Sequence, residues 1–158
     1  MLSSKAVEEK IISEHLDQQW QRREVELADW VQREKQKRRA KQTAYIGNIE
    51  VDVELLGTIT LLKRMNIQTE FSCAGVSALD EPEDHSLYGY LTIIRSEKTD
   101  QFVHLAMHHM KHRLLVTYEP AHHRYDLSSF YIGHNRSFCI LLQHCAELFC
   151  LLKKGSAK

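Results

Sequence analysis

The sequence has few of the residues that interrupt regular structure, and it lacks the patterns that identify several common classes of protein. Its 158 residues include two prolines and six glycines, and neither type occurs from Met1 to Ile46. Acidic and basic residues number 21 each, so the net charge does not favour a nucleic-acid-binding protein or an enzyme for acidic substrates. No apolar run has the length of a signal-peptide core or a membrane span. We expect one small domain, with a short appendage at most, in the cytoplasm.

The cysteine pattern excludes a disulfide framework. The chain has four cysteines and no Cys-x-x-Cys pair, and three of them, Cys139, Cys145 and Cys150, fall in one expected helix. A helix holds its own cysteines too rigidly for a disulfide between its turns. We therefore expect reduced thiols. The three cysteines of this helix are expected to serve in helix packing. Cys73 differs because it stands in a loop of small residues.

The first forty residues predict a long helix outside the main domain. With no proline or glycine to interrupt it, this helix can run from the N-terminus to about Ala40. Its apolar stripe is thin but includes Trp20, Leu27 and Trp30, which is typical of a helix that packs against a partner. We expect residues 1–44 to form a helical arm that docks on its own domain or on a second copy of the chain. The alternative is a solvated N-terminal extension.

A basic run, Arg33 to Lys41, follows the apolar stripe. Such a run can contact the phosphates of a nucleic acid. Cations also gather at the C-terminus of a helix because they complement its dipole, and no aromatic residue interleaves this run. We therefore favour a solvated helix end and keep nucleic acid as the weaker alternative.

Residues 45–154 predict an α+β domain, followed by a frayed tail at residues 155–158. Asp52 is expected to cap the first helix of this domain, and Asn66 to adopt the left-handed conformation after it. Strands in pairs, separated by helices, favour a small antiparallel or mixed sheet of about four strands packed with helices. The expected helices span about 53–65, 99–112 and 136–152, and the expected strands span 67–72, 88–95, 114–119 and 124–132.

The loop Ser72-Cys73-Ala74-Gly75 follows the first of these strands and is the main candidate for a binding site. Gly75 permits a tight turn, and the backbone N–H groups around it are able to form an anion-binding nest. Tyr88, Tyr90 and Arg95 on the neighbouring strand would add a stacking face and a cation. The leading hypothesis is a non-enzymatic module, a homodimer or larger, that binds a nucleotide or another phosphorylated small molecule. Its binding site would be formed by Ser72, Cys73, Gly75, Tyr88, Tyr90 and Arg95.

Cys73 also supports a second hypothesis, an enzyme. Its thiol would act as a nucleophile if a base lay close and the thiolate were stabilised. The base would be His85, His122, His123 or His134, because spacing selects none of them. The simpler interpretation is a small side chain chosen to fit a crowded turn. A third hypothesis is a regulatory protein that docks a partner through the N-terminal helix.

A row of histidines, His104, His108 and His112, recurs at four-residue spacing, which allows two of them to share a zinc ion. Helical geometry places this row opposite the apolar face of the same helix, so the row faces solvent. A third ligand would have to come from another segment. We therefore expect surface histidines here, and neither a metal ion nor another cofactor.

The run from Leu61 to Gly75, with the strand Tyr88-Gly89-Tyr90, resembles small uncharacterised proteins of Gram-positive bacteria and their phages. In those proteins a helix ending in Asn-x-x-Gly-Tyr-x-Thr leads to Ser-Cys-x-Gly-His and a strand. This chain has Asn66-Ile67 in place of Gly-Tyr, and Val76 in place of the histidine. A fainter likeness is to the wybutosine-synthesis methyltransferase family, which also places a Ser-Cys-x-Gly loop after its first strand. That likeness implies an enzyme that modifies RNA.

Overall fold

The computed structural model describes residues 8–33, 40–78, 81 and 85–156, and it has an α+β fold. A five-stranded antiparallel sheet has the order β1-β6-β7-β5-β4, and β2 and β3 form a separate hairpin. Within these residues, no helix combines the length and the apolar composition that a membrane-spanning segment requires. The strands are β1 (Lys10–Ile11), β2 (Thr43–Ile46), β3 (Ile49–Asp52), β4 (Thr69–Cys73), β5 (Tyr90–Ile94), β6 (Leu114–Glu119) and β7 (Arg124–Ser129), and the helices are α1 (Asp17–Gln32), α2 (Val53–Arg64), α3 (Glu97–Met110) and α4 (Asn135–Ser156).

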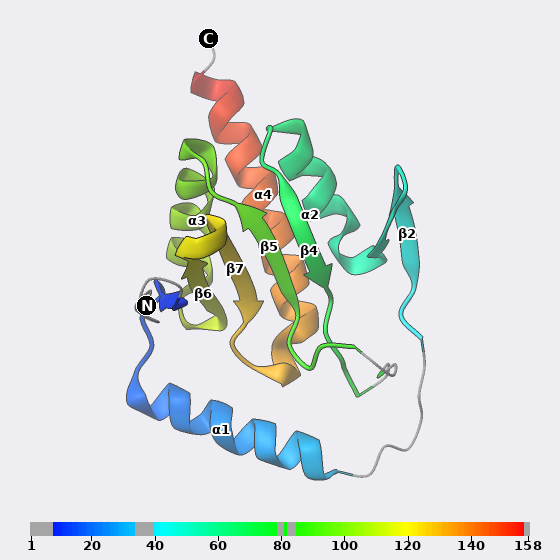
Figure 1. The fold of residues 1–158 in the computed structure, drawn as a ribbon, viewed down its shortest axis with the longest axis vertical. Helices are drawn as coiled ribbons and strands as arrows, with labels where there is room; N and C mark the ends of the chain where they lie inside the picture. Colours follow the sequence, from blue (N-terminus) through cyan, green and yellow to red (C-terminus); the bar gives the residue numbers. More distant parts are fainter. Residues whose placement is uncertain (1–7, 34–39, 79–80, 82–84, 157–158) are drawn as a thin grey trace, which may run out of the picture.

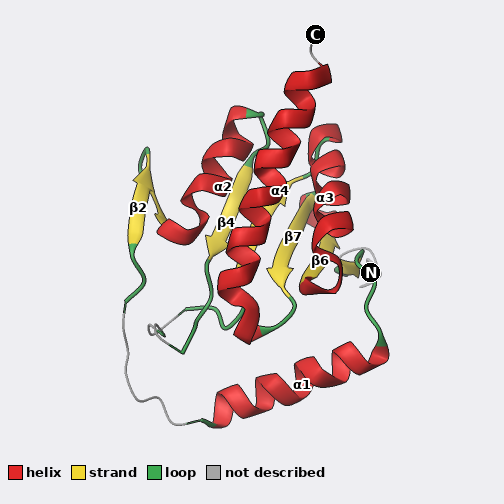
Figure 2. Ribbon diagram, turned by 180° about the vertical axis from the view of Figure 1, so that it is seen from behind, coloured by secondary structure: helices red, strands yellow, loops and turns green. Residues whose placement is uncertain are grey.

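Three helices, α2, α3 and α4, cover one face of the sheet (Figures 1 and 2). Leu91, Leu127 and Val116 are directly opposed on β5, β7 and β6, and all three are fully buried against these helices. Because side chains alternate along a strand, Tyr90 and Asp126 lie on the opposite face. We call that surface the open face, because none of the helices within the described residues lies over it (Figure 1).

The prediction of a helix from the N-terminus to about Ala40 was wrong in its extent. Among the described residues, α1 begins at Asp17, and Lys10 and Ile11 form a strand that pairs with β6. Ser13 continues this attachment, since its hydroxyl accepts a hydrogen bond from the Val116 N–H at 2.9 Å. Pairing with the free edge of a sheet therefore replaces helix formation here, a tertiary contact that intrinsic propensity does not include. Residues 34–39, most of the basic run, lie outside the described residues.

α1 lies across one end of the sheet and docks on the domain of its own chain (Figure 1). Trp20 packs edge-on against Phe130, with ring centroids 4.9 Å apart. Trp30 donates a hydrogen bond from Nε1 to Glu81 at 3.3 Å. Of the three residues expected to dock, Leu27 remains exposed. Trp20 and Trp30 thus contact the main domain, which was one of the two expected partners.

Gly47-Asn48 is a turn signal in the sequence and predicts a hinge at residues 42–48, but this segment contributes to a β-hairpin. Gly47 has a φ of +60°, and Ile46 pairs with Ile49 across the turn. The turn was predicted from Gly47 and Asn48, but the strands on either side of it were not. Asn66 adopts the expected left-handed conformation with a φ of +61°.

Candidate functional site

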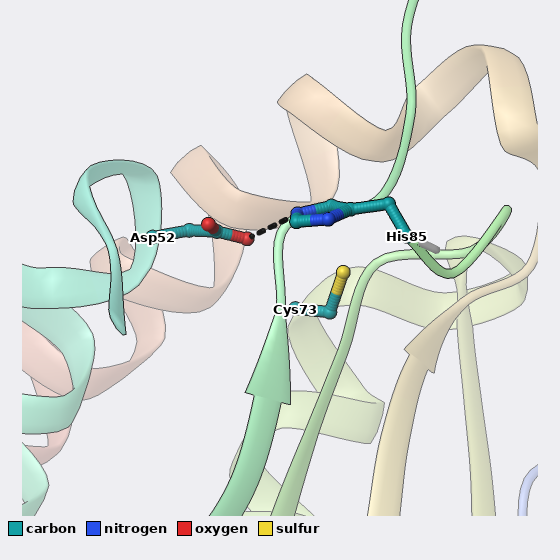
Figure 3. A group of neighbouring side chains, drawn as sticks. All are labelled: Asp52, Cys73 and His85. Carbon is teal, nitrogen blue, oxygen red and sulfur yellow. Dashed lines mark hydrogen bonds and ion pairs between the residues drawn. The ribbon is translucent and has the colours of Figure 1, made fainter. Parts of the chain in front are cut away.

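Three side chains from separate segments converge at one end of the sheet, and Figure 3 shows them pointing toward one another. Asp52 ends β3, Cys73 ends β4, and His85 belongs to the loop that leads to β5. Each offers one possible metal-ligand atom, and these atoms all lie within 4.8 Å of one another. Asp52 and Cys73 are buried, and His85 is half-buried. We call this group the Asp52–Cys73–His85 cluster.

Asp52 has a different role from the helix cap that its position predicted. Its side chain accepts no hydrogen bond from the first turn of α2. Instead, Oδ2 accepts a hydrogen bond from the Ala74 N–H at 2.7 Å and lies 3.2 Å from Nε2 of His85. The carboxylate therefore joins the start of α2 to the loop after β4, and it orients His85.

Cys73 is 7% exposed, and its Sγ accepts a hydrogen bond from the Gly75 N–H at 3.4 Å. Burial raises the pKa of the Cys73 thiol, and the charge of Asp52 also raises it. The N–H groups of Gly75 and Ser86 and the charge of Lys41 act in the opposite direction without cancelling this rise. A thiol with a raised pKa retains its proton at neutral pH, which makes it a poor nucleophile unless a cation replaces that proton.

The loop after β4 is held in a tight cradle. Gly75 has a φ of +77°, and a Cβ at this position would lie 2.4 Å from the Gly89 nitrogen. Buried Asn135 holds the surrounding backbone, since its amide donates to the Val76 and Leu87 carbonyls and accepts from the Gly89 N–H. Only glycine fits Gly75 without displacing this backbone.

The expected anion nest has two of its donors directed at the protein itself. The Ala74 N–H donates to Asp52, and the Gly75 N–H donates to Cys73. A nest binds an anion through successive backbone N–H groups that point outward together. The loop therefore offers fewer free donors to a phosphate than its small residues suggested.

The other predicted binding residues are spread over different surfaces. Tyr90 lies directly opposite Cys73 in the β4–β5 register, so these two residues are brought together. Tyr88 packs beneath the guanidinium of Arg23 on α1, 3.9 Å from its ring centroid. Ser72 lines a separate cavity of about 180 Å³ between β4 and the β2–β3 hairpin. Arg95 follows the opposite end of β5 and pairs with an acidic residue of α3, Asp100, at 3.4 Å.

One histidine belongs to the cluster and the others lie elsewhere, a distinction that the sequence spacing did not indicate. Of the four proposed bases, His85 is the one that belongs to the cluster. His122 instead contacts Glu119 at 2.6 Å, and His123 contacts Tyr118 at 3.4 Å, while the ring of His134 lies against Tyr131. The row formed by His104, His108 and His112 is exposed, as expected. In the part of the chain that the structure describes, the three-residue metal-ligand group is the Asp52–Cys73–His85 cluster.

Both described ends of the basic run have partners within the chain. Arg33 forms an ion pair with Glu81 and also lies over the ring of Trp30. Lys41 is buried, and its Nζ lies 3.0 Å from Oε2 of Glu54. Cations that are already paired and partly desolvated contribute less to phosphate binding than free surface cations. This finding weighs against phosphate contact by these two residues. The expected solvated helix end is wrong for Lys41, which is buried and lies beyond the end of α1.

Sequence reasoning missed Asp52 as a site residue, because its position was interpreted only as a helix cap. Comparisons of the chain with protein-family models, curated proteins and solved structures find no match.

Proposed function

We propose that this chain binds one divalent transition metal ion of the zinc class through Asp52, Cys73 and His85, and that the ion holds a small-molecule ligand. The observation that carries the proposal is the convergence of a thiol, an imidazole and a carboxylate within 4.8 Å. These are the three side-chain types that bind zinc in proteins. The presence of the soft thiolate ligand favours zinc over magnesium or calcium, which prefer oxygen ligands.

One separation within the cluster is close to the geometry of such an ion. Zinc bonds of about 2.0–2.3 Å at tetrahedral angles separate the ligand atoms by about 3.3–3.6 Å. Oδ2 of Asp52 and Nε2 of His85 are 3.2 Å apart, close to that separation. An ion between them would exchange their direct contact for two bonds to the metal. It would also take the place of the Cys73 proton, because a metal deprotonates a thiol that it binds.

Backbone N–H groups of the loop after β4 hold two of the three candidate ligand atoms in place. The Ala74 N–H holds Oδ2 of Asp52, and the Gly75 N–H holds Sγ of Cys73. Hydrogen bonds of this kind orient ligands and tune a metal site. Three protein ligands leave one tetrahedral position, which is where zinc proteins bind water or a ligand. The expected ligand-binding module is therefore retained, with the metal ion in place of a phosphate nest.

A thiol enzyme is the second candidate, because His85 and Asp52 both lie close to Cys73. A Cys–His mechanism requires the histidine to take the proton of the thiol, with the carboxylate orienting the far side of the ring. Here Nε2 of His85 contacts Asp52, which is compatible with either function. Burial raises the pKa of Cys73, and this observation favours metal binding over a free nucleophile.

The test is metal analysis of protein purified without a metal-affinity step. We expect one zinc-class ion per chain, and loss of that ion in Cys73→Ser and His85→Ala. Cys145→Ser is the matched control, because Cys145 is a buried cysteine of α4 outside the cluster. Replacement by Co²⁺ should produce a sulfur-to-cobalt charge-transfer band that Cys73→Ser abolishes and Cys145→Ser retains. A metal-free protein that takes up neither ion, with rapid alkylation of Cys73, would instead support the thiol enzyme.

A further inference from the structure

The open face beside Cys73 carries a row of polar side chains that the metal site does not use. Tyr90 lies opposite Cys73 on one side and opposite Ser128 on the other. Asp126 lies opposite Thr92, two residues along β5 from Tyr90, so Asp126 and Tyr90 are diagonal neighbours. Diagonal neighbours on one face of a sheet are about 7–8 Å apart, within reach of an aromatic side chain. Tyr90 and Asp126 therefore border the cluster on the same surface.

Asp126 is a half-buried carboxylate with few partners. Its Oδ1 accepts a hydrogen bond from Thr92 at 3.3 Å, and among the described residues no cation forms an ion pair with it. Arg124 is the nearest cation on its strand, but it pairs with Glu119 at 2.8 Å and with Glu70 at 3.1 Å. A carboxylate that is taken from water without a paired charge is costly to the fold.

Tyr90 is half-buried, and its ring lies on the same face of the sheet as Asp126. Burial raises the pKa of Tyr90, and the charges of Cys73, Asp126 and Asp52 add to that effect. An aromatic ring next to a carboxylate is a combination that attracts cations, through charge and through the face of the ring.

We infer that the ligand of the Asp52–Cys73–His85 cluster carries a cationic amine or amidine group, which binds on the open face between Asp126 and Tyr90. This inference rests on the proposed function, because the metal ion would hold the other end of that ligand. The carboxylate accepts the N–H groups of the cation, and the Tyr90 hydroxyl bonds to a neighbouring polar atom of the ligand. A phosphate at the same place would be repelled by Asp126 and by Glu9, whose charge also acts on Asp126.

The test uses three matched probes: benzylamine, the neutral benzyl alcohol and the anionic phenyl phosphate. Each is titrated into zinc-loaded and metal-free protein, and amide NMR shifts of β5 and β7 report binding. We expect benzylamine to shift these signals and the other two probes to bind more weakly. Asp126→Asn should weaken benzylamine binding about tenfold or more. Asp100→Asn, which changes a control carboxylate on α3 that pairs with Arg95 beyond the other end of β5, should leave it unchanged.

Two results would overturn the inference: phenyl phosphate binding at these strands at least as tightly as benzylamine, or no shift with benzylamine at millimolar concentration. Equal binding to wild type and Asp126→Asn would also contradict it. Metal content is measured on the same samples, so the two proposals fail separately. If the protein binds zinc but not benzylamine, the site for a cationic group is refuted and the metal site stands. If the protein binds benzylamine but takes up no metal, the proposed metal-binding function is refuted and the site for a cationic group stands.

Discussion

Asp126 should destabilise the folded protein at neutral pH, and this cost can be measured. Burial is the main cause that raises the pKa of Asp126 from 3.8 to about 6. Between these two values the folded state binds more protons than the unfolded state. The contribution of Asp126 to the free energy of unfolding is therefore most favourable below about pH 4. This stabilisation is lost as the pH rises through 6. A rise of about two pKa units corresponds to roughly 3 kcal/mol at pH 7.5.

Replacement of Asp126 by asparagine removes the charge and keeps an oxygen that can accept the hydrogen bond from Thr92. We expect Asp126→Asn to raise the free energy of unfolding by about 2–3 kcal/mol at pH 7.5. The gain should shrink toward zero near pH 4, where the wild-type carboxyl is protonated in the folded state.

The assay is urea unfolding followed by circular dichroism at pH 4 and pH 7.5, on metal-free protein. Asp29→Asn is the control, because Asp29 is exposed on α1 and its replacement should change stability by less than about 0.5 kcal/mol. A variant at Asp126 that is no more stable than wild type at pH 7.5 would refute the reasoning. An equal gain at both pH values would show that charge burial is not its cause.

Three further changes test the contacts that hold the site and α1. Gly75→Ala should destabilise the protein by about 2 kcal/mol or more, because its Cβ would lie 2.4 Å from the Gly89 nitrogen at a left-handed φ. Asn135→Ala should cost about 3 kcal/mol, because it leaves three backbone groups unpaired in two buried hydrogen bonds and one part-buried one. Trp20→Ala should cost about 2 kcal/mol through loss of its packing on Phe130. Thermal and urea unfolding measure all three.

Each of these predictions has a control: the same substitution at an unconstrained glycine for Gly75→Ala, and an exposed position on the same helix for the other two. Gly155→Ala, with open space around its Cβ, should leave stability within about 0.5 kcal/mol of wild type, unlike Gly75→Ala. Ser137→Ala, at an exposed position of α4, is the control for Asn135→Ala. Val25 is exposed on α1, and Val25→Ala is the control for Trp20→Ala. A loss in a control as large as in its test variant would contradict the contact assigned to that test.

Hydrophobic periodicity and local turn chemistry were sufficient to predict most of the main domain. The expected strand at 114–119 coincides with β6, and the expected helices at 53–65, 99–112 and 136–152 correspond to α2, α3 and α4. Ser96 caps α3, since its hydroxyl accepts a hydrogen bond from the Thr99 N–H. These features depend on residues close together in the sequence, which is why pattern reasoning predicts them.

The elements that were missed depend on distant partners. β1 is two residues long and exists because Lys10 and Ile11 pair with the edge of β6, more than a hundred residues later. The expected sheet of about four strands has five, with a separate hairpin, for the same reason. Short strands have little periodicity of their own, so tertiary pairing decides their formation.

The candidate site was predicted only in part. The loop after β4 and the pairing of Cys73 with Tyr90 follow from two neighbouring strands, and Cys73 was a candidate from the start. The contribution of Asp52 depends on a hydrogen bond from the Ala74 N–H, and the choice of His85 depends on how its loop returns to β5. Neither contact has a spacing signal, because each joins segments separated by other elements.

The most direct test of the metal site is a competition titration of metal-free protein with Zn²⁺ against a chromophoric chelator. Wild type and Cys145→Ser should each bind one ion per chain at the site. Cys73→Ser should lose that ion while remaining folded by circular dichroism. Equal zinc binding by wild type and a folded Cys73→Ser, or no binding by either, would contradict a metal ion held by Asp52, Cys73 and His85.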